Sequence, residues 1–157
     1  MQLRGQLCAD IQTPANEAHS SISDAREELR IEYRPGAEGL FAEALAAAES
    51  NDARLRQTTV GPHRDDLAFS LSERSAEFAS EGQQRTLVLS LRLGAARLLG
   101  SHFGTPPVCL IDDVFGELDV KRRNGLLACL PAHAQKLVTT THLDWLREVA
   151  GKVIRLG

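Results

Sequence analysis

The second half of the chain predicts an α/β fold with a mainly parallel sheet. Apolar runs at 108–111, 136–141 and 153–156 have the character of strands, and segments of helical character at about 119–130 and 143–149 separate them. Parallel strands need a crossover connection, usually a helix, to return to the same edge of a sheet. The order strand, helix, strand, helix, strand therefore indicates a parallel sheet flanked by helices.

Composition excludes several classes of protein. The 157 residues are 43% hydrophobic and 25% charged, as in globular domains, and a net charge of −3 argues against a strongly basic protein that coats nucleic acid. No apolar run approaches the roughly 20 residues of a membrane helix, and the start of the chain lacks an apolar signal core. We therefore expect a cytoplasmic protein. Three widely spaced cysteines, Cys8, Cys109 and Cys129, form no zinc or disulfide pattern.

The first half of the chain predicts two helices and a hairpin. Residues 2–22 form a polar helix without a strong period, and residues 28–34 alternate apolar and polar side chains as a half-buried strand does. An Ala-rich helix at 38–50 follows. Its apolar stripe consists of Leu40, Phe41, Ala44, Leu45 and Ala48. A strand at 67–71, a polar turn at about 72–75 and a short return segment complete a hairpin.

Ser80 precedes a long helix with a Gly-containing first turn. The apolar positions Leu87, Leu91, Ala95 and Leu98 follow a helical spacing, and residues 100–107 form a loop. The start of such a helix offers backbone N–H groups and a positive dipole end to an anion, and Ser80 adds a hydroxyl. The alternative is that Ser80 only caps the helix.

Two carboxylates follow the strand at 108–111. At the carboxyl end of a buried parallel strand, Asp112 suits Mg²⁺ and Asp113 suits the polarisation of a water that attacks a phosphate. The alternative is an acidic loop after a core strand.

Two further residues lie at comparable positions. Asp119 is placed to cap the helix that ends near Leu130, after a Gly116-Glu117-Leu118 turn. His142 directly follows the strand at 136–141, where it either donates a hydrogen bond into a site or is an ordinary exposed polar residue.

The four features occur in the order found in ABC-type ATPase heads. The stretches GPHRDDL (61–67), ASEGQQRTLVLSLRL (79–93), CLIDDVFGELDVKRR (109–123) and VTTTH (138–142) closely resemble the C-terminal part of the RecF family of recombination-mediator ATPases. The segment EYRPG (32–36) and the helix after it are similar to that family as well. The resemblance covers essentially the whole chain.

The resemblance assigns a role to each site residue. Ser80, Gly82 and Gln83 match the ABC signature, which binds the γ-phosphate of ATP held by the other subunit of an ATP-dependent homodimer. Asp112 matches the Walker B aspartate that holds Mg²⁺, and Asp113 matches the catalytic acid. Asp119 closes the D-loop at the dimer interface and His142 matches the switch histidine near the γ-phosphate.

Two departures accompany the resemblance. Glu81 introduces a carboxylate where ABC signatures usually have Gly and RecF proteins have Gln, which is unfavourable beside a phosphate unless the side chain points away. No G-x-x-x-x-G-K-[ST] phosphate loop (Walker A) occurs in the chain. The expected fold is therefore the C-terminal half of an ABC-type head, a P-loop NTPase fold without its Walker A segment. Residues 1–57 are expected to end a helical lobe II and residues 58–157 to form part of ATPase lobe I.

The resemblance implies an ATP-dependent DNA-binding protein of recombinational repair. Such proteins bind gapped DNA, take part in the SOS response, and act with RecR and RecO in loading RecA. We expect this chain alone to be inactive toward ATP and its sheet to leave an apolar edge or face that favours self-association. The alternatives are a non-catalytic interaction module and a divergent SMC-like head outside recombination. The candidate DNA contacts are Arg56, Arg64, Arg74, Arg85, Arg92, Arg122 and Arg123.

Overall fold

A computed structural model describes residues 2–141 and 151–155 of the chain. Its helices are α1 (Gln2–Ser23), α2 (Phe41–Leu55), α3 (Glu81–Phe103) and α4 (Val120–Cys129). Its strands are β1 (Leu29–Arg34), β2 (Asp66–Leu71), β3 (Arg74–Ser75), β4 (Cys109–Asp112) and β5 (Lys136–Thr139). Short 3₁₀ helices span Pro62–Arg64, Ala76–Phe78 and Val114–Glu117.

The elements form a mixed α/β fold, as the sequence predicts, in two small sheets. Strand β1 pairs antiparallel with β2, which pairs with β3, and Leu29 lies opposite Leu71. Strands β4 and β5 are parallel, with Asp112 opposite Thr139. Parallel pairing in the described residues is therefore confined to β4 and β5, which α4 connects as a crossover helix.

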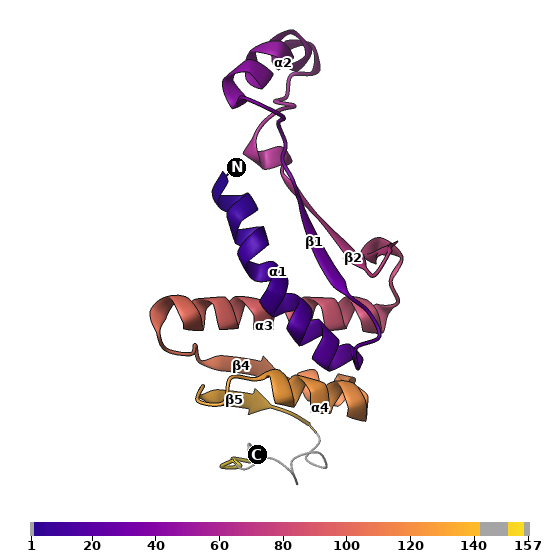
Figure 1. The fold of residues 1–157 in the computed structure, drawn as a ribbon, viewed down its shortest axis with the longest axis vertical. Helices are drawn as coiled ribbons and strands as arrows, with labels where there is room; N and C mark the ends of the chain where they lie inside the picture. The colour runs from indigo at the N-terminus through magenta and orange to yellow at the C-terminus, as the bar shows by residue number, and fades with distance from the viewer. Residues whose placement is uncertain (1, 142–150, 156–157) are drawn as a thin grey trace.

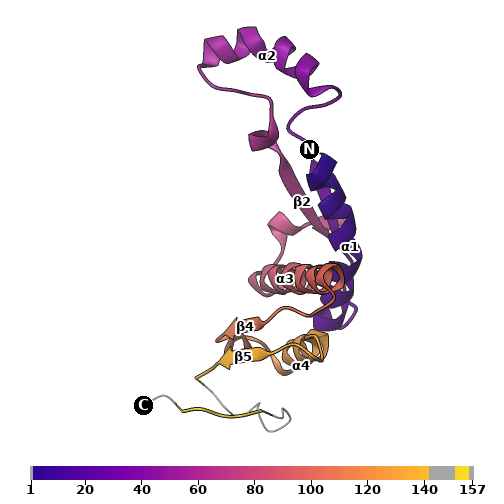
Figure 2. The ribbon, with the colours of Figure 1, turned by 90° about the vertical axis from the view of Figure 1, so that its left-hand side faces the viewer.

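The molecule is extended, and its ends differ in packing. The ribbon of β1 and β2 rises away from α3 and carries α2 at its far end, whereas α4, β4 and β5 lie at the opposite end (Figures 1 and 2). Helix α1 packs against α3 and α4. Two buried clusters follow from this arrangement. The first comprises Ala18, Ile22, Leu93, Phe115, Leu118, Leu126 and Cys129, and the second Ala15, Leu29, Leu71 and Leu87.

Two glycines allow α1 to approach its neighbours closely. A Cβ atom on Gly94 of α3 would lie 2.9 Å from the backbone of Ala15, and one on Gly125 of α4 would lie 2.3 Å from the carbonyl oxygen of Ser21. A side chain at either position therefore cannot be accommodated without moving the backbone of α1.

The structure corrects two helix boundaries. Helix α2 begins at Phe41 and continues to Leu55, and none of its residues is buried, so the predicted apolar stripe of 38–50 contributes nothing to the buried core of the described residues. Helix α3 continues through Gly100 to Phe103 and ends at Gly104, whose φ of 70° suits the left-handed C-terminal turn. The predicted loop therefore begins about four residues later than the sequence pattern indicated.

The buried face of α3 also differs from the predicted one. Leu87 is buried as expected, but Thr86, Ser90 and Gly94 share the buried face with Leu93. Hydroxyl groups occupy this face because Thr86 and Ser90 donate to carbonyl oxygens four residues earlier, at 2.9 and 2.6 Å.

The predicted C-terminal strand is wrong within the described residues. Val153, Ile154 and Arg155 have no regular secondary structure and are exposed. The predicted helix at 143–149 and His142 lie outside the described residues.

The boundary predicted at residue 57 is crossed by extensive contacts. Helix α1 packs against α3 and α4, and β1 pairs with β2 along its whole length. The division into lobes stays a prediction. Within residues 2–141 and 151–155, no helix has the length and apolar character needed to cross a membrane.

Candidate functional site

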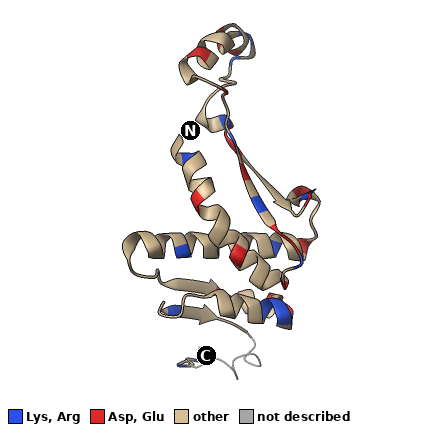
Figure 3. Ribbon diagram, viewed as in Figure 1, with Lys and Arg blue, Asp and Glu red and all other residues tan. Residues whose placement is uncertain are grey.

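A polar pocket lies where the end of α1 meets the beginnings of α3 and α4. It encloses about 250 Å³ and is lined by Ser80, Gln83 and Asp119 among others. Three of the seven residues predicted to form the ATP site are therefore neighbours. Both acidic and basic side chains also line the pocket. They are Asp24, Arg26, Glu27, Lys121 and Arg122. Basic residues gather at the start of α4 (Figure 3).

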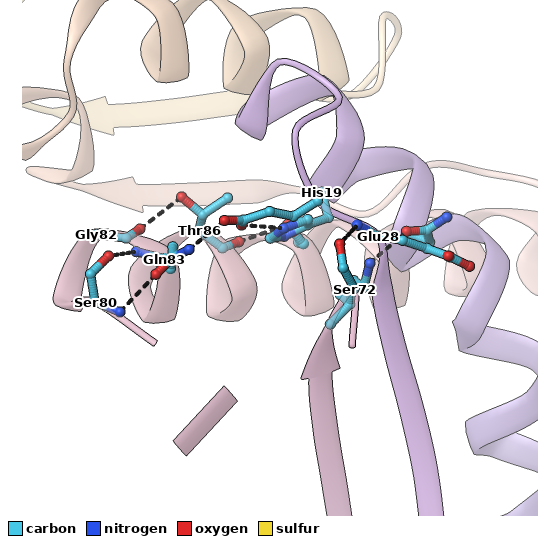
Figure 4. Close-up of polar contacts among 11 residues, drawn as sticks. His19, Glu28, Ser72, Ser80, Gly82, Gln83 and Thr86 are labelled. Carbon is cyan, nitrogen blue, oxygen red and sulfur yellow. Dashed lines mark hydrogen bonds and ion pairs between the residues drawn. The ribbon is translucent and has the colours of Figure 1, made fainter. Parts of the chain in front are cut away.

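Ser80 caps α3 in a reciprocal arrangement. Its Oγ accepts from the backbone N–H of Gln83 at 3.3 Å, while Gln83 Oε1 accepts from the backbone N–H of Ser80 at 2.8 Å (Figure 4). This capping box satisfies two backbone donors and fixes the first turn of α3. Ser80 thus caps the helix. Its hydroxyl is exposed, and no described residue accepts its hydrogen, which is therefore available to a ligand.

Gly82 leaves room for the guanidinium of Arg122. A Cβ atom on Gly82 would lie 2.8 Å from Arg122 Nη1. The same guanidinium lies 3.3 Å from the carboxylate of Asp119, which also accepts from the backbone N–H of Arg122 at 2.9 Å and so caps α4. Gly82, Arg122 and Asp119 therefore connect the predicted signature with the predicted D-loop.

Glu81 is paired and directed away from the pocket. Arg85 donates to Glu81 at 2.7 Å and to Glu117 at 2.9 Å. Glu81 and Glu117 flank one guanidinium, which reduces the repulsion that a carboxylate beside a phosphate would exert. Glu81 does not line the pocket.

Arg123 holds the loop that carries Asp119. Its guanidinium donates to the carbonyl oxygens of Phe115 at 3.2 Å and Leu118 at 3.1 Å. Phe115 and Leu118 are buried in the first cluster. The loop between β4 and α4 is therefore anchored to the core by both its apolar and its backbone groups.

Asp112 and Asp113 lie at the carboxyl end of β4, as predicted. The Thr139 hydroxyl donates to Asp112 Oδ1, and the backbone N–H of Asp113 donates to the carbonyl oxygen of Thr139 at 3.1 Å. Both acids are exposed, and Asp113 has a φ of 47°. No hydrogen bond or ion pair joins either acid to Ser80, Gln83 or Asp119 in the described part of the chain. The structure thus separates the predicted residues into two groups.

The exposed carboxylate of Asp112 fits a role in holding Mg²⁺. Mg²⁺ prefers hard oxygen ligands and is often held by one or two carboxylates, with water and substrate phosphates completing its shell. The described residues contain no cluster of three His, Cys, Asp or Glu side chains that could hold a metal ion by themselves. Asp112 therefore suits a shared site in which phosphate supplies further ligands.

His19 is the one strongly buried titratable group beside the pocket. Burial lowers its pKa below the usual 6.5, Glu27 opposes this shift, and Arg122 adds to it. Its Nε2 lies 3.5 Å from Glu27 Oε2, and its Nδ1 lies 3.3 Å from Ser90 Oγ (Figure 4).

The GPHRDDL segment builds a corner rather than part of the pocket. Asp65 accepts from the backbone N–H of Gly36 at 2.8 Å, from Tyr33 Oη at 2.7 Å and from Arg4 Nη1 at 2.6 Å. These hydrogen bonds, with that of Gly36 foremost, hold the pKa of Asp65 at about 2. Asp65 therefore ties the start of α1, the end of β1 and the start of β2 together.

Four of the seven arginines suggested as DNA contacts make internal contacts. Arg85, Arg122 and Arg123 hold the loops described above, and Arg64 donates to the carbonyl oxygen of Thr58 at 3.0 Å. The side chains of Arg56, Arg74 and Arg92 make no hydrogen bond or ion pair among residues 2–141 and 151–155.

Sequence reasoning missed Glu27, His19 and Arg122 as parts of the site. His19 lies in α1 and Glu27 in the turn after it, more than fifty residues before Ser80. Neither residue carries a local sequence signal of its position in the site. The glycine at position 82 was the only signal for Arg122, since it marks a close approach.

Comparison with known proteins relates this chain to a group of DNA repair proteins. The DNA replication and repair protein RecF of Lactobacillus delbrueckii subsp. bulgaricus is 41% identical over 166 residues, which cover 98% of this chain and 44% of that protein. RecF of Agathobacter rectalis is 41% identical over 143 residues, covering 90% of this chain and 39% of that protein. No protein-family model matches the chain.

Solved structures give the same relationship. The recombination mediator protein RecF-ATP in the RecFOR pathway superimposes with a TM-score of 0.73 at 26% sequence identity, covering 91% of this chain and 41% of that one. A second structure, RecF-ATPrS in the same pathway, gives a TM-score of 0.74 at 26% identity, covering 90% of this chain and 41% of that one.

The fold and the solved structures that superimpose on it define a class of protein: the chain has the mixed α/β architecture of the RecF ATPases. Within that class, the chain is a RecF homologue along nearly all of its length, and it spans less than half of the curated RecF proteins that it matches.

Proposed function

We propose that the chain supplies the signature and Walker B part of a RecF-like, ATP-dependent DNA-binding protein of recombinational repair. The similarity to RecF along nearly the whole chain supports this proposal. The observation that carries it is the capped start of α3, where Ser80 presents a hydroxyl hydrogen that no described residue accepts.

Ser80 would act on ATP held by a second subunit. Its hydroxyl would donate to a γ-phosphate oxygen, and the backbone N–H groups at the start of α3 would add a positive potential. Gly82 would keep Arg122 close by, and Asp119 would hold that guanidinium at the subunit interface. The charge of Glu81 would be partly offset by Arg85, which it shares with Glu117.

The second group of residues would act on ATP bound to the same subunit. Asp112 would hold Mg²⁺, oriented by the hydrogen bond from Thr139, and Asp113 would accept a proton from the attacking water. Bound Mg²⁺-ATP supplies the phosphoryl group and the charge neutralisation that the reaction needs. His142 would lie near the γ-phosphate.

The proposed assembly is an ATP-dependent homodimer in the cytoplasm that binds gapped DNA. By similarity to RecF it would take part in the SOS response and act with RecR, RecO and RecA. Arg56, Arg74 and Arg92 stay candidates for DNA contact because their side chains are not engaged in the described part of the molecule. This chain alone would neither bind nor hydrolyse ATP, because it contains no Walker A loop.

Calorimetry with Mg²⁺-ATP tests this proposal. The isolated chain is expected to give no binding heat. A chimera in which this chain replaces the matching segment of Lactobacillus delbrueckii RecF is expected to bind, and Asp112→Asn is expected to weaken binding at least tenfold. Binding by the isolated chain that Asp112→Asn abolishes would show that a complete site forms without a Walker A lysine.

One observation favours a second function, that of a non-catalytic interaction module. Leu110 is 77% exposed and Leu137 is 52% exposed, so β4 and β5 present an apolar surface. If the chimera bound no ATP while the chain associated through Leu110, this second function would be preferred.

A further inference from the structure

The side chain of Gln83 is held at both of its polar ends. Its Oε1 accepts from the backbone N–H of Ser80, and its Nε2 donates to Glu27 Oε1. A primary amide has one oxygen and one NH₂ group, so these two contacts fix the orientation of the amide. Because Ser80 and Gln83 cap each other, fixing Gln83 also fixes Ser80.

Glu27 reaches Gln83 because of the turn that follows α1. Asp24 and Ala25 have φ values of 62° and 54°, and the backbone N–H of Ala25 donates to the carbonyl oxygen of Ser20 at 2.7 Å. Two successive non-glycine residues in the left-handed region are uncommon and persist only where the surroundings hold them. The turn brings Glu27 across the start of α3.

His19 faces the other oxygen of Glu27 from within α1. The Ser90 hydroxyl donates to the carbonyl oxygen of Thr86 at 2.6 Å, so its oxygen is left to accept from His19 Nδ1 at 3.3 Å. The Nδ1–H tautomer then leaves the buried Nε2 without a hydrogen-bond partner, 3.5 Å from Glu27 Oε2. A proton on Nε2 would complete a continuous chain of contacts from Ser90 to Ser80.

Glu27 and Gln83 also form the boundary between two pockets. Both line the pocket that contains Asp119, and both line a second pocket of about 470 Å³ that contains Arg74 and Phe78. The contact between them is therefore at the surface where a ligand of either pocket would lie.

We propose that Glu27 is a positioning residue for Ser80, acting through Gln83. This inference rests on the proposed function, because it concerns the same phosphate-facing serine. It makes the orientation of Ser80 depend on the α1 turn, which lies in the other predicted lobe.

Nuclear magnetic resonance of the full chain tests the inference. In Glu27→Ala, the side-chain order parameter of Gln83 is expected to fall from a rigid value to below about 0.6, and the Ser80 amide resonance is expected to shift. Glu27→Gln retains an oxygen that accepts from Gln83 and is expected to restore both signals. Glu28→Ala is the matched control, since Glu28 pairs with Arg30 at 3.1 Å and not with α3.

A double-variant cycle separates positioning from general loosening of the fold. Gln83→Ala is expected to shift the Ser80 amide as Glu27→Ala does, and the two together are expected to add no further shift, because they act in series. Additive shifts, or an unchanged Ser80 and Gln83 in Glu27→Ala, would overturn the inference. If Glu27→Ala does not fold, Gln83→Ala and Glu27→Gln are compared instead. The inference then requires that Gln83→Ala shifts the Ser80 amide resonance and that Glu27→Gln leaves it unshifted.

Titration of the RecF chimera with inorganic triphosphate distinguishes this inference from the proposed function. Triphosphate is expected to shift the Ser80 resonance, with an affinity that Glu27→Ala weakens at least threefold and Glu28→Ala leaves unchanged. This result would support both the positioning role of Glu27 and the proposed function. Loss of Gln83 order in Glu27→Ala without any response of Ser80 to triphosphate would support the positioning role and count against the phosphate role of this site.

Discussion

Single side chains connect segments that are far apart in the sequence. Asp65 joins Arg4, Tyr33 and Gly36, and Arg85 joins the start of α3 to the loop before α4. Asp65 thereby forms a salt-bridged corner in the GPHRDDL segment. The partners of Asp65 were not predictable, because they depend on how β1 and α1 meet.

Asp65 is expected to contribute stability that is lost in acid. Its pKa is about 2 in the folded chain against an ordinary value of 3.8, so its contribution is complete above pH 3.8 and is lost as the pH falls toward 2. Urea unfolding between pH 2 and 7 should show this loss in the wild-type chain and a smaller pH dependence in Asp65→Asn.

Asp66→Asn is the control for this prediction. Asp66 is exposed, and its carboxylate accepts only from the backbone N–H of its neighbour Leu67 among the described residues. An equal loss of acid dependence in Asp66→Asn would contradict the assigned role of Asp65.

His19 is expected to act in the same direction as Asp65, but nearer neutral pH. Its folded pKa lies below the ordinary 6.5, so the unfolded chain binds more protons as the pH falls below 6.5. The free energy of unfolding should therefore decrease as the pH falls from 6.5, and His19→Gln should remove part of this slope. His133 is exposed, so His133→Gln is the control and should leave the slope unchanged. Unfolding curves at pH 5 to 7.5 compare the wild-type chain with the two variants.

At the scale of elements, hydrophobic periodicity predicted most of the helices and strands. Helix α1, strands β1, β2, β4 and β5, and the caps at Ser80 and Asp119 lie where the sequence indicated. The errors concern ends and faces. Gly100 suggested the end of a helix that continues to Phe103, and the apolar stripe of α2 is not buried in the described molecule. Local patterns do not report where a neighbouring element lies.

Two helix crossings are expected to be sensitive to a single methyl group. Gly94→Ala and Gly125→Ala place a Cβ atom against the backbone of α1, and overpacking of this kind costs about 1–3 kcal/mol. Gly100→Ala lies in the same helix as Gly94, but its nearest neighbour is 3.6 Å away, so the better helix propensity of Ala should stabilise it by up to about 1 kcal/mol. Chemical unfolding of the three variants measures these changes.

Equal stabilities of the three variants would contradict the close packing of α1 against α3 and α4. If Gly94→Ala and Gly125→Ala were as stable as Gly100→Ala, α1 would not approach α3 and α4 as closely as the glycine contacts require.

At the scale of the whole molecule, the structure brings some of the predicted site residues together and holds others apart. Ser80, Gln83 and Asp119 line one pocket, and Asp112 and Asp113 lie apart at the end of β4. Glu27 was missed, because two left-handed residues after α1 determine its position. His19 was missed, because its place beside the pocket depends on how α1 packs against α3. The role of His142 stays a prediction, since that residue lies outside the described part of the chain.

We expect a second subunit to complete the ATP site to which Ser80 contributes. Ser80→Arg places a long charged side chain at the start of α3 and should block the approach of a second subunit. Ser101→Arg is a matched control at the other end of the same helix, where the Ser101 hydroxyl donates only to a carbonyl oxygen of its own helix, that of Arg97 at 3.0 Å.

Sedimentation of the RecF chimera with and without Mg²⁺-ATP is the most direct test. The chimera and its Ser101→Arg variant should form dimers only when ATP is present, and Ser80→Arg should remain monomeric at the same ATP concentration. Dimers of Ser80→Arg that form with ATP as readily as those of the unsubstituted chimera would contradict the assignment of this surface to a shared ATP site.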